Sequence, residues 1–122
     1  MPRILVIDDD ATIRRMLHTL LEREGHEILE ASNGKEALRL HRVSPVELVI
    51  TDILMPEMDG LELILALRRQ APDLRVIAMS GGGDSKQHQV LDVAEPFGAF
   101  ATVRKPFKLD EMLTTVRRAL SA

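Results

Sequence analysis

The chain has 122 residues, a hydrophobic fraction of 45% and a formal net charge of −3, which is the size and composition of one ordinary domain. The weak negative charge gives no attraction toward nucleic acid or an anionic membrane, so neither is expected as a direct partner. No apolar run approaches the roughly 20 residues that span a bilayer. The absence of cysteine excludes disulfide and thiol chemistry and fits a cytoplasmic protein. We expect residues 1–122 to form a single domain.

The first half of the chain alternates short apolar runs with longer segments of helical spacing. A buried strand is predicted over 4–7, followed by an amphipathic helix over 12–24 that Gly25 ends. A second strand over 26–31 leads through a turn to a short helix over 35–42.

The second half repeats this alternation. A strand over 48–51 is followed by a helix that Asp59 caps and that Pro72 limits. The remaining elements are predicted strands over 76–79 and 100–104 and predicted helices over 84–94 and 110–120. Such alternation favours an α/β fold, with a five-stranded parallel sheet, doubly wound and covered by helices on both faces. The common strand order is 2-1-3-4-5, and ligands of this fold bind outside the carboxyl ends of the strands.

Polar side chains mark the ends of four predicted strands. Asp8 and Asp9 follow the first strand, Asp52 the third, Ser80 the fourth and Lys105 the fifth. Because the first and third strands are neighbours in this order, these side chains should converge at one edge of the sheet. Asp10, the third acid of the first run, is better interpreted as a helix cap. The arginine pairs, such as Arg14-Arg15, are interpreted as solvated helix faces.

Carboxylates gathered in one cleft repel each other and need neutralisation. Two like charges about 4 Å apart cost roughly 4 kcal/mol at an effective dielectric constant near 20, so a bound cation, protons or Lys105 must compensate. A site built only from carboxylate oxygens favours Mg²⁺ over Zn²⁺. A carboxylate beside such an ion can act as a nucleophile toward phosphorus, and Lys105 and Ser80 can hold phosphoryl oxygens. The residues therefore predict metal-assisted chemistry on an anion, without selecting phosphoryl transfer.

Four motifs resemble the receiver domain of bacterial two-component response regulators, of the kind found in chemotaxis regulators. The resemblance extends from Arg3 to Leu120 and is carried by the segments ILVIDDD (4–10), LVITDILMPEMDG (48–60), VIAMSG (76–81) and GAFATVRKPF (98–107). It implies that Asp52 is the phosphoryl acceptor. It also implies that Mg²⁺ is held by Asp8, Asp9, Asp52 and the backbone carbonyl of Leu54.

The resemblance assigns further roles around this acceptor. Ser80 is the hydroxyl that moves toward the phosphoryl group, Lys105 pairs with that group, and the Lys105–Pro106 bond is expected to be cis. The phosphoryl donor would be a phosphohistidine on a sensor histidine kinase or a histidine phosphotransfer protein. The signal would pass to a downstream effector protein or a fused output domain. The domain would catalyse its own phosphorylation and dephosphorylation but no other reaction.

One position departs from the family pattern. Receivers usually carry an aromatic residue three positions before the lysine, where this chain has Thr102. Strand alternation predicts that Phe100 lies on the same face as Thr102. We therefore expect weaker activation, or a signal that passes through the glycine-rich loop 81–83. The face formed by the predicted elements 84–94, 100–104 and 110–120 is a candidate homodimer interface, with Arg104 and Lys108 near it.

Three alternatives remain open on the residues alone. The run Asp8-Asp9-Asp10-Ala11-Thr12 fits the D-x-D-x-T signature of haloacid-dehalogenase-type phosphatases, in which Asp8 would be the nucleophile. That family also needs a later acidic pair that follows a strand, and the sequence shows no such pair. A flavodoxin-like redox protein would need a phosphate loop and aromatic residues over the flavin. A receiver that only binds partners is the third alternative, although every key polar position is filled.

Overall fold

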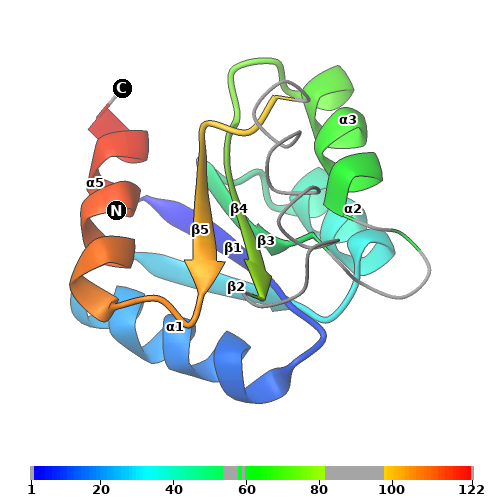
Figure 1. Cartoon of the computed structure of the whole chain (residues 1–122). Helices are drawn as coiled ribbons and strands as arrows, with labels where there is room; N and C mark the ends of the chain where they lie inside the picture. The colour runs from blue at the N-terminus through cyan, green and yellow to red at the C-terminus, as the bar shows by residue number, and fades with distance from the viewer. Residues whose placement is uncertain (1, 54–57, 59, 82–97, 122) are drawn as a thin grey trace.

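The computed structural model describes residues 2–53, 58, 60–81 and 98–121 (Figure 1). The helix predicted over 84–94, the proposed ligand Leu54, the proposed cap Asp59 and residues 82–83 of the glycine-rich loop lie outside the described residues. The described elements are β1 (Arg3–Ile7), α1 (Ala11–Arg23), β2 (Glu27–Ala31), α2 (Gly34–Val43), β3 (Leu48–Asp52), α3 (Gly60–Gln70), β4 (Arg75–Gly81), β5 (Ala101–Lys105) and α5 (Leu109–Ser121).

The five strands form one parallel sheet in the order β2-β1-β3-β4-β5, which confirms the predicted doubly wound α/β fold. The boundaries differ from the predicted ones where they matter for the site. Strand β4 continues through Ser80 to Gly81, and β3 and β5 include Asp52 and Lys105 as their last residues. The sheet's own hydrogen-bonding ladder therefore positions these side chains, which the sequence pattern had placed just beyond the strands.

Helices cover both faces of the sheet (Figure 1). One buried cluster joins α2 and α3 to the sheet through residues such as Ala37, Leu63 and Val49. The other joins α1 and α5 to the opposite face through residues such as Leu17 and Met112. Buried apolar surface on both faces is the main stabilising contribution in a fold of this kind. Within the described residues, none of the helices combines the length and the apolar character that a membrane span requires.

Side-chain caps fix where the first two helices begin. The side chain of Asp10 accepts a hydrogen bond from the Thr12 amide at 2.9 Å, as predicted for the start of α1. The side chain of Asn33 accepts one from the Glu36 amide at 2.9 Å and caps α2, where the sequence predicted only a turn. The Asp10 cap matters for the site because it holds the turn that contains Asp8 and Asp9.

The prediction for Phe100 is wrong. Strand β5 begins only at Ala101, so alternation does not extend back to Phe100, whose amide donates to the Val76 carbonyl at 2.7 Å. Phe100 packs against the cluster under α1 and α5, with the Arg75 guanidinium 5.2 Å from its ring centroid. Thr102 is in register with Ala78, which belongs to the cluster on the opposite face. No aromatic side chain from this strand therefore accompanies Thr102.

Candidate functional site

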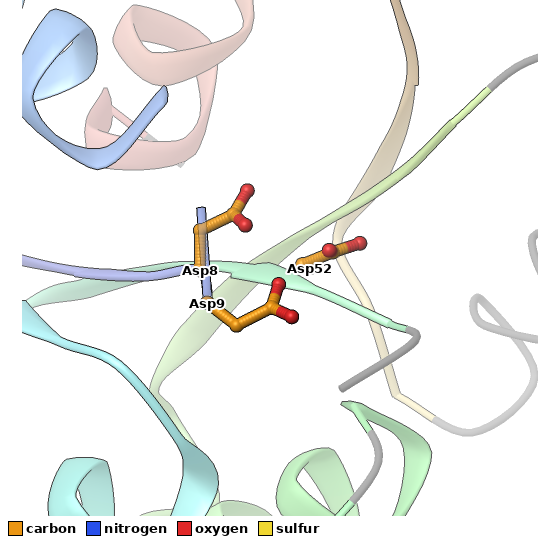
Figure 2. A group of neighbouring side chains, drawn as sticks. All are labelled: Asp8, Asp9 and Asp52. Atoms are coloured by element: carbon orange, nitrogen blue, oxygen red, sulfur yellow. The ribbon is translucent and has the colours of Figure 1, made fainter. Parts of the chain in front are cut away.

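The three predicted acids meet at the carboxyl ends of β1 and β3. One carboxylate oxygen from each of Asp8, Asp9 and Asp52 lies within 4.8 Å of the other two (Figure 2). Asp8 is fully buried and Asp52 is 8% exposed, whereas Asp9 is open to solvent. The acidic group is therefore buried at its inner end and open to solvent on the side of Asp9, as a site for an exchangeable ligand must be.

Asp8 is held on both carboxylate oxygens. Its Oδ1 accepts from the Asp10 amide at 2.9 Å, and its Oδ2 accepts from Lys105 Nζ at 2.7 Å. Its own amide donates to the carbonyl of Ala31 in β2 at 3.2 Å. These contacts satisfy a buried carboxylate that would otherwise be costly, and they fix its direction toward the acidic group.

Lys105 bridges the two strands that carry the acids. Its Nζ lies 2.7 Å from Asp8 Oδ2 and 3.4 Å from Asp52 Oδ2, and its peptide bond to Pro106 is cis, as the resemblance implied. Burial acts to lower the pKa of Lys105, but the hydrogen bond to Asp8 and the charges of Asp52 and Asp8 outweigh it, and the pKa is raised. The ammonium is therefore charged at neutral pH and neutralises part of the acidic cluster.

The carboxyl group of Asp52 has an unusual pKa. Burial raises it most, Lys105 opposes this, and the charges of Asp8 and Asp9 raise it further, which brings the pKa of Asp52 to about 6. Asp52 is consequently ionised at neutral pH but close enough to its pKa to bind protons under mild acid. An ionised, nearly buried carboxylate beside an ammonium is a suitable nucleophile toward an electrophilic, negatively charged group.

Ser80 and Gly60 complete the described part of this edge. Ser80 is fully buried and follows Met79, the register partner of Asp52. The Gly60 amide donates to the Ile53 carbonyl at 2.6 Å, which brings the start of α3 against the end of β3. A Cβ at Gly60 would lie 2.5 Å from Ile53 Cα, so only glycine permits this approach. Gly60 therefore sets the position of the strand end that carries Asp52.

Arg14 contacts the acidic group, although its place in an arginine pair predicts a solvated helix face. Its Nη1 donates to the backbone carbonyl of Asp8 at 2.7 Å, and its Nε lies 3.2 Å from Glu30 Oε1. Its side chain is 16% exposed, while the neighbouring Arg15 is exposed. One feature of the sequence could have predicted this contact. Side chains in a helix lean toward its N-terminus, and near the start of α1 this direction leads from Arg14 toward the turn that contains Asp8.

The donor set fits a hard divalent cation. Asp8, Asp9 and Asp52 offer carboxylate oxygens only, without His or Cys, and such a set prefers Mg²⁺ or Ca²⁺ to Zn²⁺. Lys105 already compensates one negative charge from the buried side. A cation would bind on the solvent-exposed side of the acidic group, where Asp9 lies, and would neutralise the remaining negative charge there.

Replacing Asp52 with asparagine is expected to stabilise the folded chain in magnesium-free buffer. The folded pKa of Asp52 is about 6 against an ordinary value of 3.8, so its ionised form destabilises the fold. At pH 7.5 we expect Asp52→Asn to raise the free energy of unfolding by about 1–2 kcal/mol, after allowance for solvent screening. The gain should shrink as the pH falls through 6 toward 4, because the parent side chain then becomes protonated. Urea denaturation across this pH range measures the effect, with the exposed Asp73→Asn as a control that should show no gain.

Comparisons with known proteins agree with this geometry. The family model described as response regulator receiver domain matches residues 4–117. Chemotaxis protein CheY of Bacillus subtilis is 34% identical and aligns over 98% of both chains. The transcriptional regulator NtrC of Azospirillum brasilense is 39% identical over 98% of this chain, which spans only 24% of NtrC. The crystal structure of the NtrX receiver domain from Brucella abortus superposes with a TM-score of 0.91, at 34% identity and 98% coverage of both chains.

The share of each relative's length that this chain spans differs among these proteins. The chain spans between about a quarter and a half of NtrC, the regulatory protein AtoC of Escherichia coli and the ycf27 regulator of Porphyra purpurea (24%, 25% and 47%), but nearly all of CheY. The match gives no support to the haloacid-dehalogenase alternative with Asp8 as the nucleophile. The strand order and the acidic group at the ends of β1 and β3 agree with the match to the receiver family. The chain therefore belongs to the response regulator receiver domain family.

Proposed function

We propose that this receiver accepts a phosphoryl group from a phosphohistidine on the carboxylate of Asp52, with Mg²⁺ as the cofactor. The observation that supports this most directly is the arrangement of charge. Three carboxylates meet within 4.8 Å, and Lys105 contacts both the most buried acid and the proposed acceptor. Such a site combines a nucleophile with groups that bind an anionic transition state.

Asp8, Asp9 and Asp52 would hold the Mg²⁺ ion through carboxylate oxygens, together with the carbonyl of Leu54, which lies outside the described residues. When bound, the ion would neutralise the acids and polarise the phosphoryl oxygens. Asp8 has its two oxygens engaged by Asp10 and Lys105, so exposed Asp9 is the more available direct ligand. Asp8 would then act partly through water.

In the proposed transfer, an oxygen of Asp52 attacks the phosphorus atom of the donor. The new P–O bond forms as the P–N bond to the donor imidazole breaks, and the released nitrogen keeps the electron pair. Lys105, which already lies 3.4 Å from Asp52 Oδ2, would pair with a phosphoryl oxygen as negative charge arrives. Later attack of water on phosphorus would release phosphate and restore Asp52, so the domain catalyses both its phosphorylation and its dephosphorylation.

The signal would then leave through Ser80 and Thr102. The hydroxyl of Ser80 would move toward the phosphoryl group at the shared sheet edge. Thr102 is half-buried and too small to fill the space of an aromatic residue, so we propose weaker coupling than in receivers that carry the aromatic. The partners would be a sensor histidine kinase or histidine phosphotransfer protein and a downstream effector or fused output domain, within the cytoplasm. Homodimerisation would use the face that includes β5 and α5.

Intact-mass spectrometry after incubation with acetyl phosphate tests the proposal. We expect the parent chain and the control Asp73→Asn to gain one phosphoryl group when Mg²⁺ is present, and Asp52→Asn to gain none. Reductive trapping of the acyl phosphate, followed by peptide mapping, should place the modification on Asp52. Modification of Asp8, or an unchanged phosphoryl content in Asp52→Asn, would overturn the proposal.

A further inference from the structure

Arg14 connects the acidic site to a set of charged side chains on the outer side of α1 and β2. Its Nη1 donates to the Asp8 carbonyl at 2.7 Å, and its Nε pairs with Glu30 Oε1 at 3.2 Å. The second oxygen of Glu30 lies 2.6 Å from His18 Nδ1. Arg14 and His18 are one helical turn apart, so Glu30 of β2 is bound to α1 at two points. These contacts hold the guanidinium beside the Asp8 carbonyl.

A hydrogen bond to the Asp8 carbonyl oxygen can control the orientation of Asp9. A peptide unit is planar, so the carbonyl oxygen of Asp8 and the Cα of Asp9 lie in one rigid plane. A hydrogen bond to that oxygen therefore restricts the direction in which Asp9 leaves the strand. Asp9 is the exposed member of the acidic group and directly follows the buried Asp8 (Figure 2). The Arg14 contact thus acts on the acid that the buried Lys105 contact does not reach.

The charge of Arg14 is balanced locally. Arg14 and Glu30 are 16% and 28% exposed in their side chains, so their pair is less screened by solvent than a surface pair. The Glu30 carboxylate offsets the guanidinium charge that would otherwise oppose a cation nearby. The hydrogen-bonding effect of Arg14 can therefore be separated from its charge.

We infer that Arg14, held by Glu30, is a positioning residue that orients the Asp8–Asp9 peptide and so raises the affinity of the site for Mg²⁺. The inference rests on the Mg²⁺ site of the proposed function. Residues that orient metal ligands typically change metal affinity by about 10–100-fold when they are removed. Arg14 takes this role through the backbone of Asp8 and need not touch the ion.

Isothermal titration of the Mg²⁺-free chain with MgCl₂ at pH 7.5 tests this inference, with Arg15→Ala as the matched control. Both substitutions remove one positive charge from the same turn of α1, but Arg15 is exposed and has no hydrogen bond to Asp8. Loss of positive charge alone would leave Mg²⁺ affinity unchanged or increase it. We expect Arg14→Ala to weaken Mg²⁺ binding by about tenfold or more and Arg15→Ala to leave it unchanged or slightly tighter. A decrease in Mg²⁺ affinity would therefore indicate a positioning effect of Arg14, and an increase would indicate an effect of its charge.

Arg14→Lys gives a second variant that keeps the charge but replaces the separate Nε and Nη1 donors with one ammonium nitrogen, and it should bind Mg²⁺ with intermediate affinity. Phosphorylation by acetyl phosphate in Arg14→Ala should require a higher Mg²⁺ concentration for its half-maximal rate, raised by about the same factor as the dissociation constant. Parent-like Mg²⁺ affinity in folded Arg14→Ala or Arg14→Lys would overturn the inference and leave the proposed function standing. Failure of the parent chain to bind Mg²⁺ would overturn both.

Discussion

Replacing Lys105 with methionine is expected to lower the free energy of unfolding by about 2–4 kcal/mol in magnesium-free buffer. The ammonium lies 2.7 Å from a carboxylate oxygen of Asp8, whose side chain is 0% exposed, and the Lys105 side chain itself is only 15% exposed. Removing one partner of a buried pair leaves the other charge without compensation. The hydrogen bond from the Asp10 amide remains, so the loss should fall below that of a wholly isolated charge.

Urea denaturation at pH 7.5 measures this loss, with Lys108→Met as a control at an exposed position three residues away. The control should change the free energy of unfolding by less than about 0.5 kcal/mol. Millimolar Mg²⁺ should recover most of the loss in Lys105→Met, because a ligand that binds only the folded chain stabilises it by mass action. Equal stability of the two variants without Mg²⁺ would show that Lys105 does not compensate Asp8.

Replacing Gly60 with alanine is expected to destabilise the fold by about 3 kcal/mol, at the upper end of the usual cost of overpacking. The added Cβ would lie 2.5 Å from Ile53 Cα and 2.7 Å from the Asp52 carbonyl oxygen. Both neighbours are backbone atoms, at the last residue of β3 and the residue after it, and the Ile53 amide is bonded to the Met79 carbonyl of β4, so they cannot move aside without shifting the end of β3. The same shift would displace Asp52, the proposed acceptor, and we expect phosphorylation of Gly60→Ala to be slower even where the chain is folded.

Gly34→Ala is the matched control for this effect. A Cβ at Gly34 would also be crowded, 2.8 Å from the Met58 sulfur, but a flexible thioether side chain can move away. Thermal and urea denaturation should therefore show a loss for Gly34→Ala of less than about 1 kcal/mol. A loss as large as that of Gly60→Ala would show that backbone contact is not the reason for glycine at position 60.

The sheet and the convergence of the acids could be predicted because both follow from simple patterns. Five short apolar runs separated by helical segments predict a parallel sheet, and in such a sheet all carboxyl ends share one edge. Asp8, Asp52 and Lys105 are far apart in sequence, yet their positions at strand ends were sufficient to bring them together. The structure adds that Asp52 and Lys105 are the last residues of their strands.

The features that escaped prediction depend on tertiary contacts. Arg14 and Arg15 are adjacent on the predicted helix, and helical spacing alone does not show that Arg14 meets Glu30 and the Asp8 carbonyl; the packing of α1 against β2 brings them together and leaves Arg15 exposed. Alternation misplaced Phe100 because it holds only within a strand, and β5 begins one residue later, at Ala101. Asn33 shows the same limit on a smaller scale, since its capping role required the geometry of the helix that follows it.

Fluorine-19 NMR of the chain with beryllium fluoride tests the central claim most directly, because this phosphoryl mimic binds a carboxylate only where a complete acceptor site exists. We expect bound fluoride resonances in the parent chain when Mg²⁺ is present, none when Mg²⁺ is omitted, and none in Asp52→Asn. Bound resonances that persist in Asp52→Asn, or their absence in the parent chain at saturating Mg²⁺, would contradict a magnesium-dependent acceptor at Asp52.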